Sequence, residues 1–248
     1  MLILLPPSES KRAATRGKPL DLNALSHPAL TTRREQILRA LQTLCRDDPA
    51  TAIEILDLGP TQFDLVVGNT HLDAAPAAAA SSVYTGVLYA SLDYPSLNGQ
   101  DLRRANRRLA IVSALFGLVR PTDRIVAYRL SGSARLPGIG PLPRFWREAV
   151  SEEIGTAPGV VVDMLSSPYA SMVRLPASAL TIKVWQQDAG RPRTAVSHFN
   201  KATKGELARL LATATPEPRT AQQVLSVLRA AGWRAELDGS RLDVWMRG

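Results

Sequence analysis

The sequence predicts a mixed α/β fold, a single compact domain in which helices surround a central mixed sheet. Apolar runs of strand length, such as Leu2–Leu5 and Leu109–Ser113, alternate with segments of helical apolar spacing, such as Thr32–Cys45. The 248 residues, 45% of them hydrophobic, can bury a substantial core. We expect this domain to cover residues 1–248, with residues 216–248 as an addition at one edge of the sheet.

Lysine is concentrated in two short segments of this arginine-rich chain. Arginine outnumbers lysine by 25 to 5, and Lys11, Lys201 and Lys204 are the lysines that we take as candidates for a functional site. Lysine alone offers a compact ammonium that can lose its proton when buried. Two prolines end the first strand, so Lys11 lies on a loop. Lys201 and Lys204 fall on the first turn of a predicted helix, where cations are unfavourable unless something negative binds. Compositional drift is the alternative.

Two short helices are predicted after the first long one. Thr51–Leu58 and Thr61–Val67 are joined at Gly59-Pro60, with the proline in the first turn of the second helix. The pair resembles a helix-hairpin-helix element, whose helix N-terminus can present backbone N–H groups to a phosphate. A simple helix corner fits the same pattern.

A basic helix is predicted to begin near Asp101. Its four arginines pair at i,i+4 and are our candidates for DNA-phosphate contacts: Arg103, Arg104, Arg107 and Arg108. Charges this close repel one another unless a carboxylate or phosphate lies opposite. The formal charge of +8 and the isoelectric point near 10.1 favour a polyanion, so nucleic acid is the leading partner. A solvated arginine-rich surface is the alternative.

Two further arginines stand among apolar residues. Arg129 lies in the run Ile125–Leu130, and Arg120 follows a Phe-Gly pair that indicates a tight turn after the strand Leu109–Ser113. An arginine in such surroundings needs an anionic partner, either a protein carboxylate or a bound ligand.

The run Val160–Leu165 reads as a central strand with polar residues at its carboxyl end. Ligands of α/β sheets tend to bind beyond the carboxyl ends of strands, so Asp163, Ser166 and Tyr169 fall in a plausible site. Ser167, followed by Pro168, is equally suited to cap a helix.

The last third of the chain is predicted to complete the sheet. Strands at Leu180–Gln187 and Thr194–Phe199 flank a hairpin signal at Asp188–Gly190, and the helix Lys201–Leu211 follows. A final helix and two strands are predicted at Thr220–Ala230, Trp233–Leu237 and Leu242–Met246.

The motifs, taken together, resemble those of the peroxide stress protein YaaA family. They are Leu4–Lys11, Tyr84-Thr85-Gly86, Ser113–Pro121, Tyr128-Arg129-Leu130, Phe145-Trp146 and Asn200–Gly205. The resemblance implies a compact α/β fold with a helix-hairpin-helix-like element, a positively charged cleft, DNA binding and a role in limiting oxidative damage linked to free iron. Carried over by position, the cleft residues are Ser8, Lys11, Tyr84, Arg120, Tyr128, Arg129, Asp163, Ser166, Lys201 and Lys204, to which we add Ser10 and Tyr169 as ligand residues.

Two departures from the family pattern affect the ligand detail. One branch of the family reads Ser-Pro-Ala-Lys-Thr at the N-terminal motif, whereas this chain reads Pro-Pro-Ser-Glu-Ser-Lys and gains a carboxylate at Glu9. The segment from Pro216 onward also matches less clearly.

Three functions remain open at this stage. The first is a DNA-binding protein for duplex or branched DNA, in which the cleft cations line a pocket for a nucleotide or damaged end. The second is an enzyme acting on a nucleobase, nucleotide or abasic site, with Lys11, Asp163 and Lys204 as catalytic residues. The third is a nucleotide-binding scaffold without chemistry.

Several classes are not supported by the sequence. No apolar run reaches the length of a membrane span, no secretory leader opens the chain, and Cys45 is the only cysteine, so we expect a cytoplasmic protein and a monomer. His27, His71 and His198 are too scattered for an iron site, and we expect no metal and no cofactor. The absence of a phosphate-loop pattern leaves ATP hydrolysis unsupported.

Overall fold

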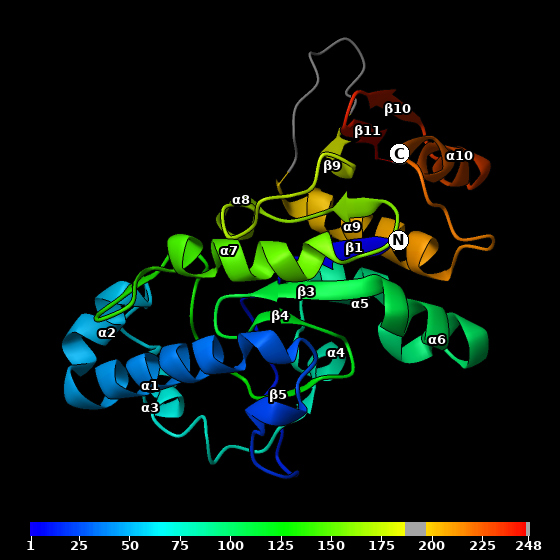
Figure 1. Ribbon diagram of the computed structural model, residues 1–248. Coiled ribbons are helices and arrows are strands. Elements are labelled where there is room, and N and C mark those ends of the chain that lie inside the picture. The colour runs from blue at the N-terminus through cyan, green and yellow to red at the C-terminus, as the bar shows by residue number, and fades with distance from the viewer. Residues whose placement is uncertain (187–196, 247–248) are drawn as a thin grey trace.

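A seven-stranded mixed sheet forms the centre of the molecule, which confirms the predicted fold class (Figure 1). The computed structural model describes residues 1–186 and 197–246, without the side chains of residues 197 and 198. The strand order is β10-β11-β9-β8-β1-β3-β4. The strands, in chain order, are β1 Leu2–Leu5, β3 Leu109–Ser113, β4 Gly117–Val119, β8 Val161–Asp163, β9 Ala179–Trp185, β10 Ala235–Asp238 and β11 Arg241–Trp245.

Parallel pairing dominates the middle of the sheet. β1 lies between β3 and β8 and runs parallel to both, with Leu4 opposite Ala110 and Asp163. β9 continues the parallel run between β8 and β11. Because β1, β3 and β8 point the same way, their carboxyl ends meet at one edge of the sheet. All four residues of β1 are buried, as expected for an apolar strand covered on both faces.

Antiparallel strands close both ends of the sheet. β4 returns beside β3 through a tight turn at Gly117, whose φ of +72° favours glycine. The glycine also leaves room for Trp146, since an added Cβ would lie 2.7 Å from its ring. At the other end, β10 pairs antiparallel with β11 and forms the last strand of the sheet.

Ten α-helices lie in the described part of the chain. Their bounds are α1 Thr31–Asp47, α2 Pro49–Ile55, α3 Phe63–Asn69, α4 Ala80–Val83, α5 Val87–Leu92, α6 Gly99–Arg108, α7 Leu142–Gly155, α8 Ser167–Ala170, α9 Ser197–Thr213 and α10 Ala221–Ala230. Short 3₁₀ turns lie at Leu22–Ala24, Pro28–Leu30 and Tyr94–Ser96, and two small two-stranded ladders pair β2 Ala78–Ala79 with β5 Arg124–Ile125 and β6 Arg135–Leu136 with β7 Gly140–Pro141. Figure 1 shows α1, α2 and α3 together at one end of the molecule and α10 with β10 and β11 at the other.

The two short helices α2 and α3 occupy the segment with the predicted hairpin. Asp48 caps α2, accepting a hydrogen bond from the Thr51 backbone N–H at 3.1 Å. Gln62, not Pro60, stands at the N-cap of α3, so the expected first-turn proline was wrong. The Gln62 side chain instead accepts a hydrogen bond from the Gly59 N–H at 2.9 Å and fixes the turn. A helix-hairpin-helix element remains a prediction.

Two local predictions near the carboxyl edge were also wrong. Ser166, and not Ser167, takes the N-cap position of α8, and its side chain makes no capping hydrogen bond. α9 begins by Ser197, so Phe199 is helical and not part of a strand. The hairpin signal at Asp188–Gly190 lies outside the described residues.

Candidate functional site

The loop after β1 is held in place by the segment around Tyr84. The Ser8 hydroxyl accepts a hydrogen bond from the Thr85 N–H at 2.9 Å, and the Arg12 N–H donates to the Val83 carbonyl at 2.8 Å. Lys11 forms an isolated β-bridge with Tyr84. Residues more than seventy positions apart in the chain thus fix the backbone on both sides of Lys11.

The Lys11 ammonium is surrounded by carbonyl groups and aromatic rings. It donates to the carbonyls of Ser8 at 2.8 Å and Glu9 at 3.3 Å, and its nitrogen lies 4.3 Å from the centre of the Tyr128 ring. Burial, aided by the positive charge of Arg129 and opposed by Glu9, lowers the pKa of Lys11 to about 7. A substantial fraction of Lys11 is therefore an uncharged amine at neutral pH.

Buried hydroxyl groups form a chain beneath Lys11. The Tyr128 hydroxyl is 3.2 Å from that of Tyr84 and 2.8 Å from the Ser113 hydroxyl, which also accepts a hydrogen bond from the Phe116 N–H. Burial raises the pKa of both Tyr84 and Tyr128 above the ordinary tyrosine value. These tyrosines are neutral donors at physiological pH. Ser113, the last residue of β3, was quoted in a motif but missed as a site residue.

A pocket of about 450 Å³ opens beside Lys11. Its lining comes from the loop after β1, from α3 with its preceding turn, and from the segment that contains Tyr128: Glu9, Ser10, Lys11, Ala13, Gln62, Asp64, Leu65, Gly68, Asn69, Ala127, Tyr128 and Arg129. The structure therefore joins the predicted residues Ser10, Lys11, Tyr128 and Arg129. The α3 wall was missed, because a polar helix face without a known motif gives no signal in a single sequence.

Arg129 links this pocket to α2. Its Nε donates to the Leu56 carbonyl at 3.2 Å and its Nη2 to that of Asp57 at 3.4 Å, while its backbone N–H and carbonyl bond the side chain of Asn69. The expected anionic partner is thus replaced, among the described residues, by carbonyl groups at the end of α2, where the helix dipole is negative. These bonds leave Nη1 available for a ligand.

Asp163 and Lys204 form a second cluster at the end of β8. The Lys204 ammonium donates to the carbonyls of Met164 at 3.0 Å and Leu165 at 3.3 Å. Asp163 accepts hydrogen bonds from the Leu165 N–H at 2.8 Å and the Thr181 hydroxyl at 3.2 Å. Burial lowers the pKa of Lys204 to about 8, while Asp163 opposes the shift. Neither Asp163 nor Lys204 contributes to the lining found for the Lys11 pocket.

The remaining cleft candidates are placed differently from one another. Tyr169 packs its ring against Gly132, and burial followed by the nearby Tyr128 raises its pKa, so it lies on the side of the Lys11 pocket. Ser166 and Lys201 are exposed. Lys201 and Lys204 lie beyond the first turn of α9, so the predicted conflict with the helix dipole was wrong.

Arg120 lies apart from these residues, at the end of α6. Its guanidinium donates hydrogen bonds to the carbonyls of Arg107 at 3.0 Å and Leu109 at 3.1 Å.

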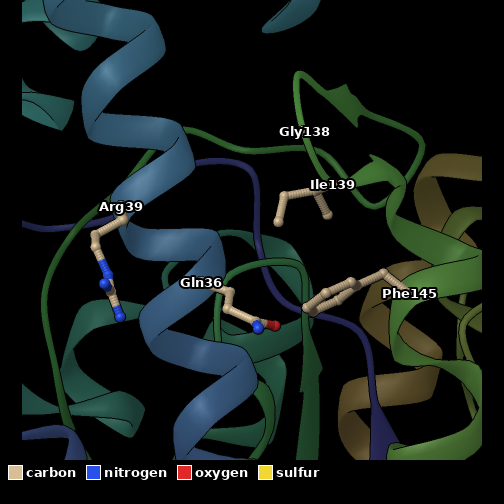
Figure 2. A pocket seen from close by; sticks show the side chains of 5 residues that line it. All are labelled: Gln36, Arg39, Gly138, Ile139 and Phe145. Carbon is tan, nitrogen blue, oxygen red and sulfur yellow. The ribbon is translucent and has the colours of Figure 1, made fainter.

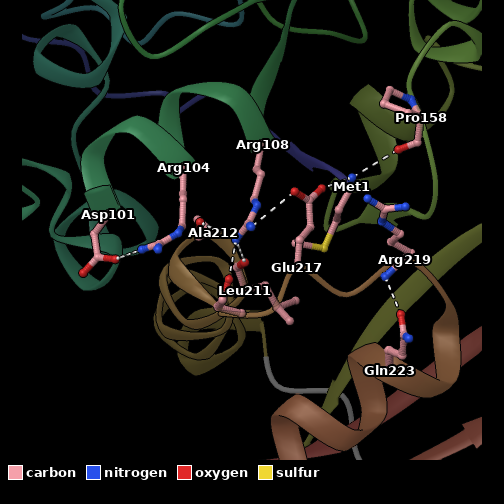
Figure 3. A network of polar contacts seen from close by, with 11 residues as sticks. Met1, Asp101, Arg104, Arg108, Pro158, Leu211, Ala212, Glu217, Arg219 and Gln223 are labelled. Carbon is pink, nitrogen blue, oxygen red and sulfur yellow. Dashed lines mark hydrogen bonds and ion pairs between the residues drawn. The ribbon is translucent and has the colours of Figure 1, made fainter. Parts of the chain in front are cut away.

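The four arginines of α6 separate into two kinds. Arg103 and Arg107 are exposed, whereas Arg104 pairs with Asp101 at 2.8 Å. Arg108 is buried and donates to the carbonyls of Leu211, Ala212 and Ala214, with Glu217 at 3.3 Å (Figure 3). The carboxylates expected to balance this charge are therefore Asp101 and Glu217. Glu217 also pairs with the amino group of Met1.

A larger hollow, of about 590 Å³, lies on another part of the surface. It is lined by Gln36 and Arg39 of α1 and by Gly138, Ile139 and Phe145, and Figure 2 shows the Gln36 side chain pointing toward Phe145. Arg39 is 76% exposed and lies 3.6 Å from Glu35. None of the five residues that line this hollow is a buried polar group.

Two absences apply to the described residues. No group of three or more His, Cys, Asp or Glu side chains is arranged there to hold a metal ion. None of the helices found there combines the length and the apolar character that a membrane crossing requires.

Comparison with known proteins places the chain in a family. The family model for peroxide stress protein YaaA matches residues 1–237. A UPF0246 protein of Streptomyces coelicolor is 42% identical over 245 residues, covering 96% of this chain and 93% of its own. One from Corynebacterium efficiens is 41% identical over 247 residues and 98% of each chain, and one from Burkholderia lata is 28% identical over 224 residues and 85% of each. This chain belongs to the peroxide stress protein YaaA family.

Proposed function

We propose that this protein binds DNA through a positively charged cleft centred on the Lys11 pocket, and that it acts in the response to peroxide stress by limiting iron-linked damage. The observation that carries the proposal is the pairing of Lys11 with Arg129 at one pocket on the carboxyl side of the sheet. The net charge of +8 supplies the long-range attraction for a polyanion.

Exposed cations extend the proposed DNA surface from the pocket. Arg12, Arg16 and Lys18 follow Lys11 on the same loop and are exposed. Arg103 and Arg107 provide a separate exposed pair on α6, which leads into the amino end of β3, whereas Arg108 is left out because its guanidinium is already committed to α9. Both groups of cations are proposed to contact phosphate groups. Such contacts position DNA without reading its sequence.

Fluorescence anisotropy with a labelled duplex tests the DNA proposal. The affinity should fall by about tenfold or more between about 50 and about 200 mM salt, because each neutralised phosphate releases counterions. Substituting the exposed Arg12, next to Lys11, by alanine should reduce affinity at low salt, with Arg219→Ala, an exposed arginine beside α10, as the control. A duplex that shows no binding at the lowest salt would remove the proposal.

The stress role is tested in cells. A strain that lacks the protein should lose more viability than its parent at a fixed peroxide dose, and a cell-permeable iron chelator should narrow the difference. Equal survival of the two strains, or a difference that the chelator leaves unchanged, would contradict the iron-linked part of the proposal.

The Lys11 amine supports a second candidate function, chemistry on an abasic site. A neutral Lys11 Nζ can attack the C1′ aldehyde of the ring-opened sugar, transfer a proton to the oxygen and expel water to give an imine. Loss of a C2′ proton then allows β-elimination of the 3′-phosphate, and hydrolysis of the imine restores the amine. The buried amine and the neighbouring neutral hydroxyl groups of Tyr84 and Tyr128 favour this reaction.

Borohydride trapping on an abasic oligonucleotide tests this candidate, since it reduces the imine to a stable secondary amine. The parent protein and Lys204→Ala should be trapped, and Lys11→Ala should not. No adduct with the parent protein would exclude the lyase, and an adduct lost only in Lys204→Ala would move the chemistry to the other cluster.

A further inference from the structure

We propose that the Lys11 pocket takes the base of an unpaired DNA nucleotide and that Phe63, at its rim, stacks on that base or its neighbour. The inference rests on the proposed DNA binding and specifies which part of the DNA enters the protein. Three observations support the inference: the shape of α3, the chemistry of the residues that line the pocket, and the exposure of the Phe63 side chain.

One face of α3 forms a wall of the pocket and keeps it open. Asp64, Leu65, Gly68 and Asn69 all line it, which is the spacing of a single helix face. Gly68 has no side chain to fill the space, and a Cβ built there would meet nothing within 4 Å. An open volume of about 450 Å³ in front of a helix face is ample for one base and its sugar.

The lining combines apolar surface with groups that recognise base edges. Leu65 and Ala127 offer apolar contact, while the carboxylates of Glu9 and Asp64 accept hydrogen bonds from amino groups. A pocket for phosphate alone would not need carboxylates. The Arg129 guanidinium and the charged fraction of Lys11 complement the nucleotide's phosphate. The edge of a base can make several hydrogen bonds to a protein pocket only when the base is not paired with another base.

Phe63 and Val67 form an exposed apolar stripe next to this wall. Phe63 is 49% and Val67 48% exposed, and their i,i+4 spacing puts them on the face of α3 adjacent to Asp64 and Gly68. Stacking of a base on an aromatic ring is a strong contribution to binding of unpaired nucleic acid and tolerates any sequence. The cations at the neighbouring pocket favour a nucleotide over an apolar partner for this stripe.

The test compares two duplexes that differ by one extrahelical base. The wild-type protein should bind a single-base bulge about tenfold more tightly than the fully paired duplex. Gly68→Leu, which fills the pocket from a position free of contacts, and Phe63→Ala should each remove most of this preference, so that the bulged and the paired duplex bind with similar affinity. Gly155→Leu, at another contact-free helical glycine, and Phe199→Ala, at another exposed phenylalanine, are the matched controls.

The outcomes separate this inference from the DNA proposal. Equal affinity of the wild-type protein for both duplexes would overturn the inference and leave DNA binding intact. A preference that survives in Gly68→Leu and Phe63→Ala would overturn it as well. No binding of either duplex would remove both. If Phe63→Ala weakens a concentration-dependent dimer seen by sedimentation and leaves DNA binding unchanged, the stripe is a self-association surface and the inference is wrong.

Discussion

Lys11 shows how a single buried amine acquires chemical character from its surroundings. Its two carbonyl partners orient the ammonium, but burial and Arg129 outweigh them and lower the pKa to about 7. Lys204 has a similar pair of carbonyl partners, yet its pKa falls less, to about 8, because Asp163 lies nearby. Lys11 and Lys204, two of the three lysines taken as candidates from the sequence, therefore differ in the charge that faces them.

The pH dependence of Lys11 acylation tests this assignment. Only the uncharged amine reacts, so a lowered pKa shifts the rise in rate to lower pH. Trace labelling with acetic anhydride and mass spectrometry should give a Lys11 rate that rises through about pH 7 and then levels off. A rate that still climbs steeply at about pH 10, the ordinary lysine range, would contradict the buried amine.

Close packing between α5 and α9 depends on one glycine. A Cβ at Gly205 would lie 2.2 Å from the Leu88 carbonyl oxygen and 2.7 Å from the Ser91 Cβ, so the two backbones touch there. This contact helps to place α9 and hence Lys204, one residue earlier. The family motif contains the glycine, but only the structure gives its reason.

Alanine at Gly205 should lower the free energy of unfolding by about 1–3 kcal/mol, because the overpacked helices must move apart. Gly68→Ala is the matched control, since its Cβ meets nothing and the change should be neutral or stabilising by up to about 1 kcal/mol. Urea unfolding of both variants measures the difference. Equal midpoints for the two would show that α5 and α9 are not in contact at Gly205.

The α6 arginines divide into structural and exposed positions within one turn. Replacing Arg108 by methionine should lower the free energy of unfolding by about 2–4 kcal/mol, because it removes a buried guanidinium with three carbonyl partners and Glu217. Arg107→Met, at an exposed position, should change stability by less than about 0.5 kcal/mol. Thermal unfolding of the two variants measures the difference. A similar loss of stability in both would contradict the structural role given to Arg108.

At the scale of the molecule, the sheet was predictable and the pocket only in part. Apolar runs such as Leu2–Leu5 and Leu109–Ser113 can form only buried strands, and both were predicted with their observed bounds. Arg107 and Arg108 look alike in the sequence because nothing local tells which one faces α9. The α3 wall was hidden for the same reason, since its importance comes from contact with a loop more than fifty residues earlier.

The parallel centre of the sheet explains why the site lies where it does. β1 ends before Ser8 and Lys11, β3 ends at Ser113, and β8 ends at Asp163, so parallel pairing gathers all of them at one edge. The Lys11 pocket and the Lys204 cluster are two parts of this edge. We propose that DNA lies over the Lys11 part.

The position of the DNA can be tested by identifying which lysine reacts with a duplex that contains an abasic site. The chain has only five lysines, so the modified residue can be assigned. The duplex is incubated with the protein and cyanoborohydride, and the modified peptide is identified by mass spectrometry. Lys11 is expected to carry the trapped DNA. Adducts confined to Lys183 or Lys201, or spread evenly over all five lysines, would contradict it.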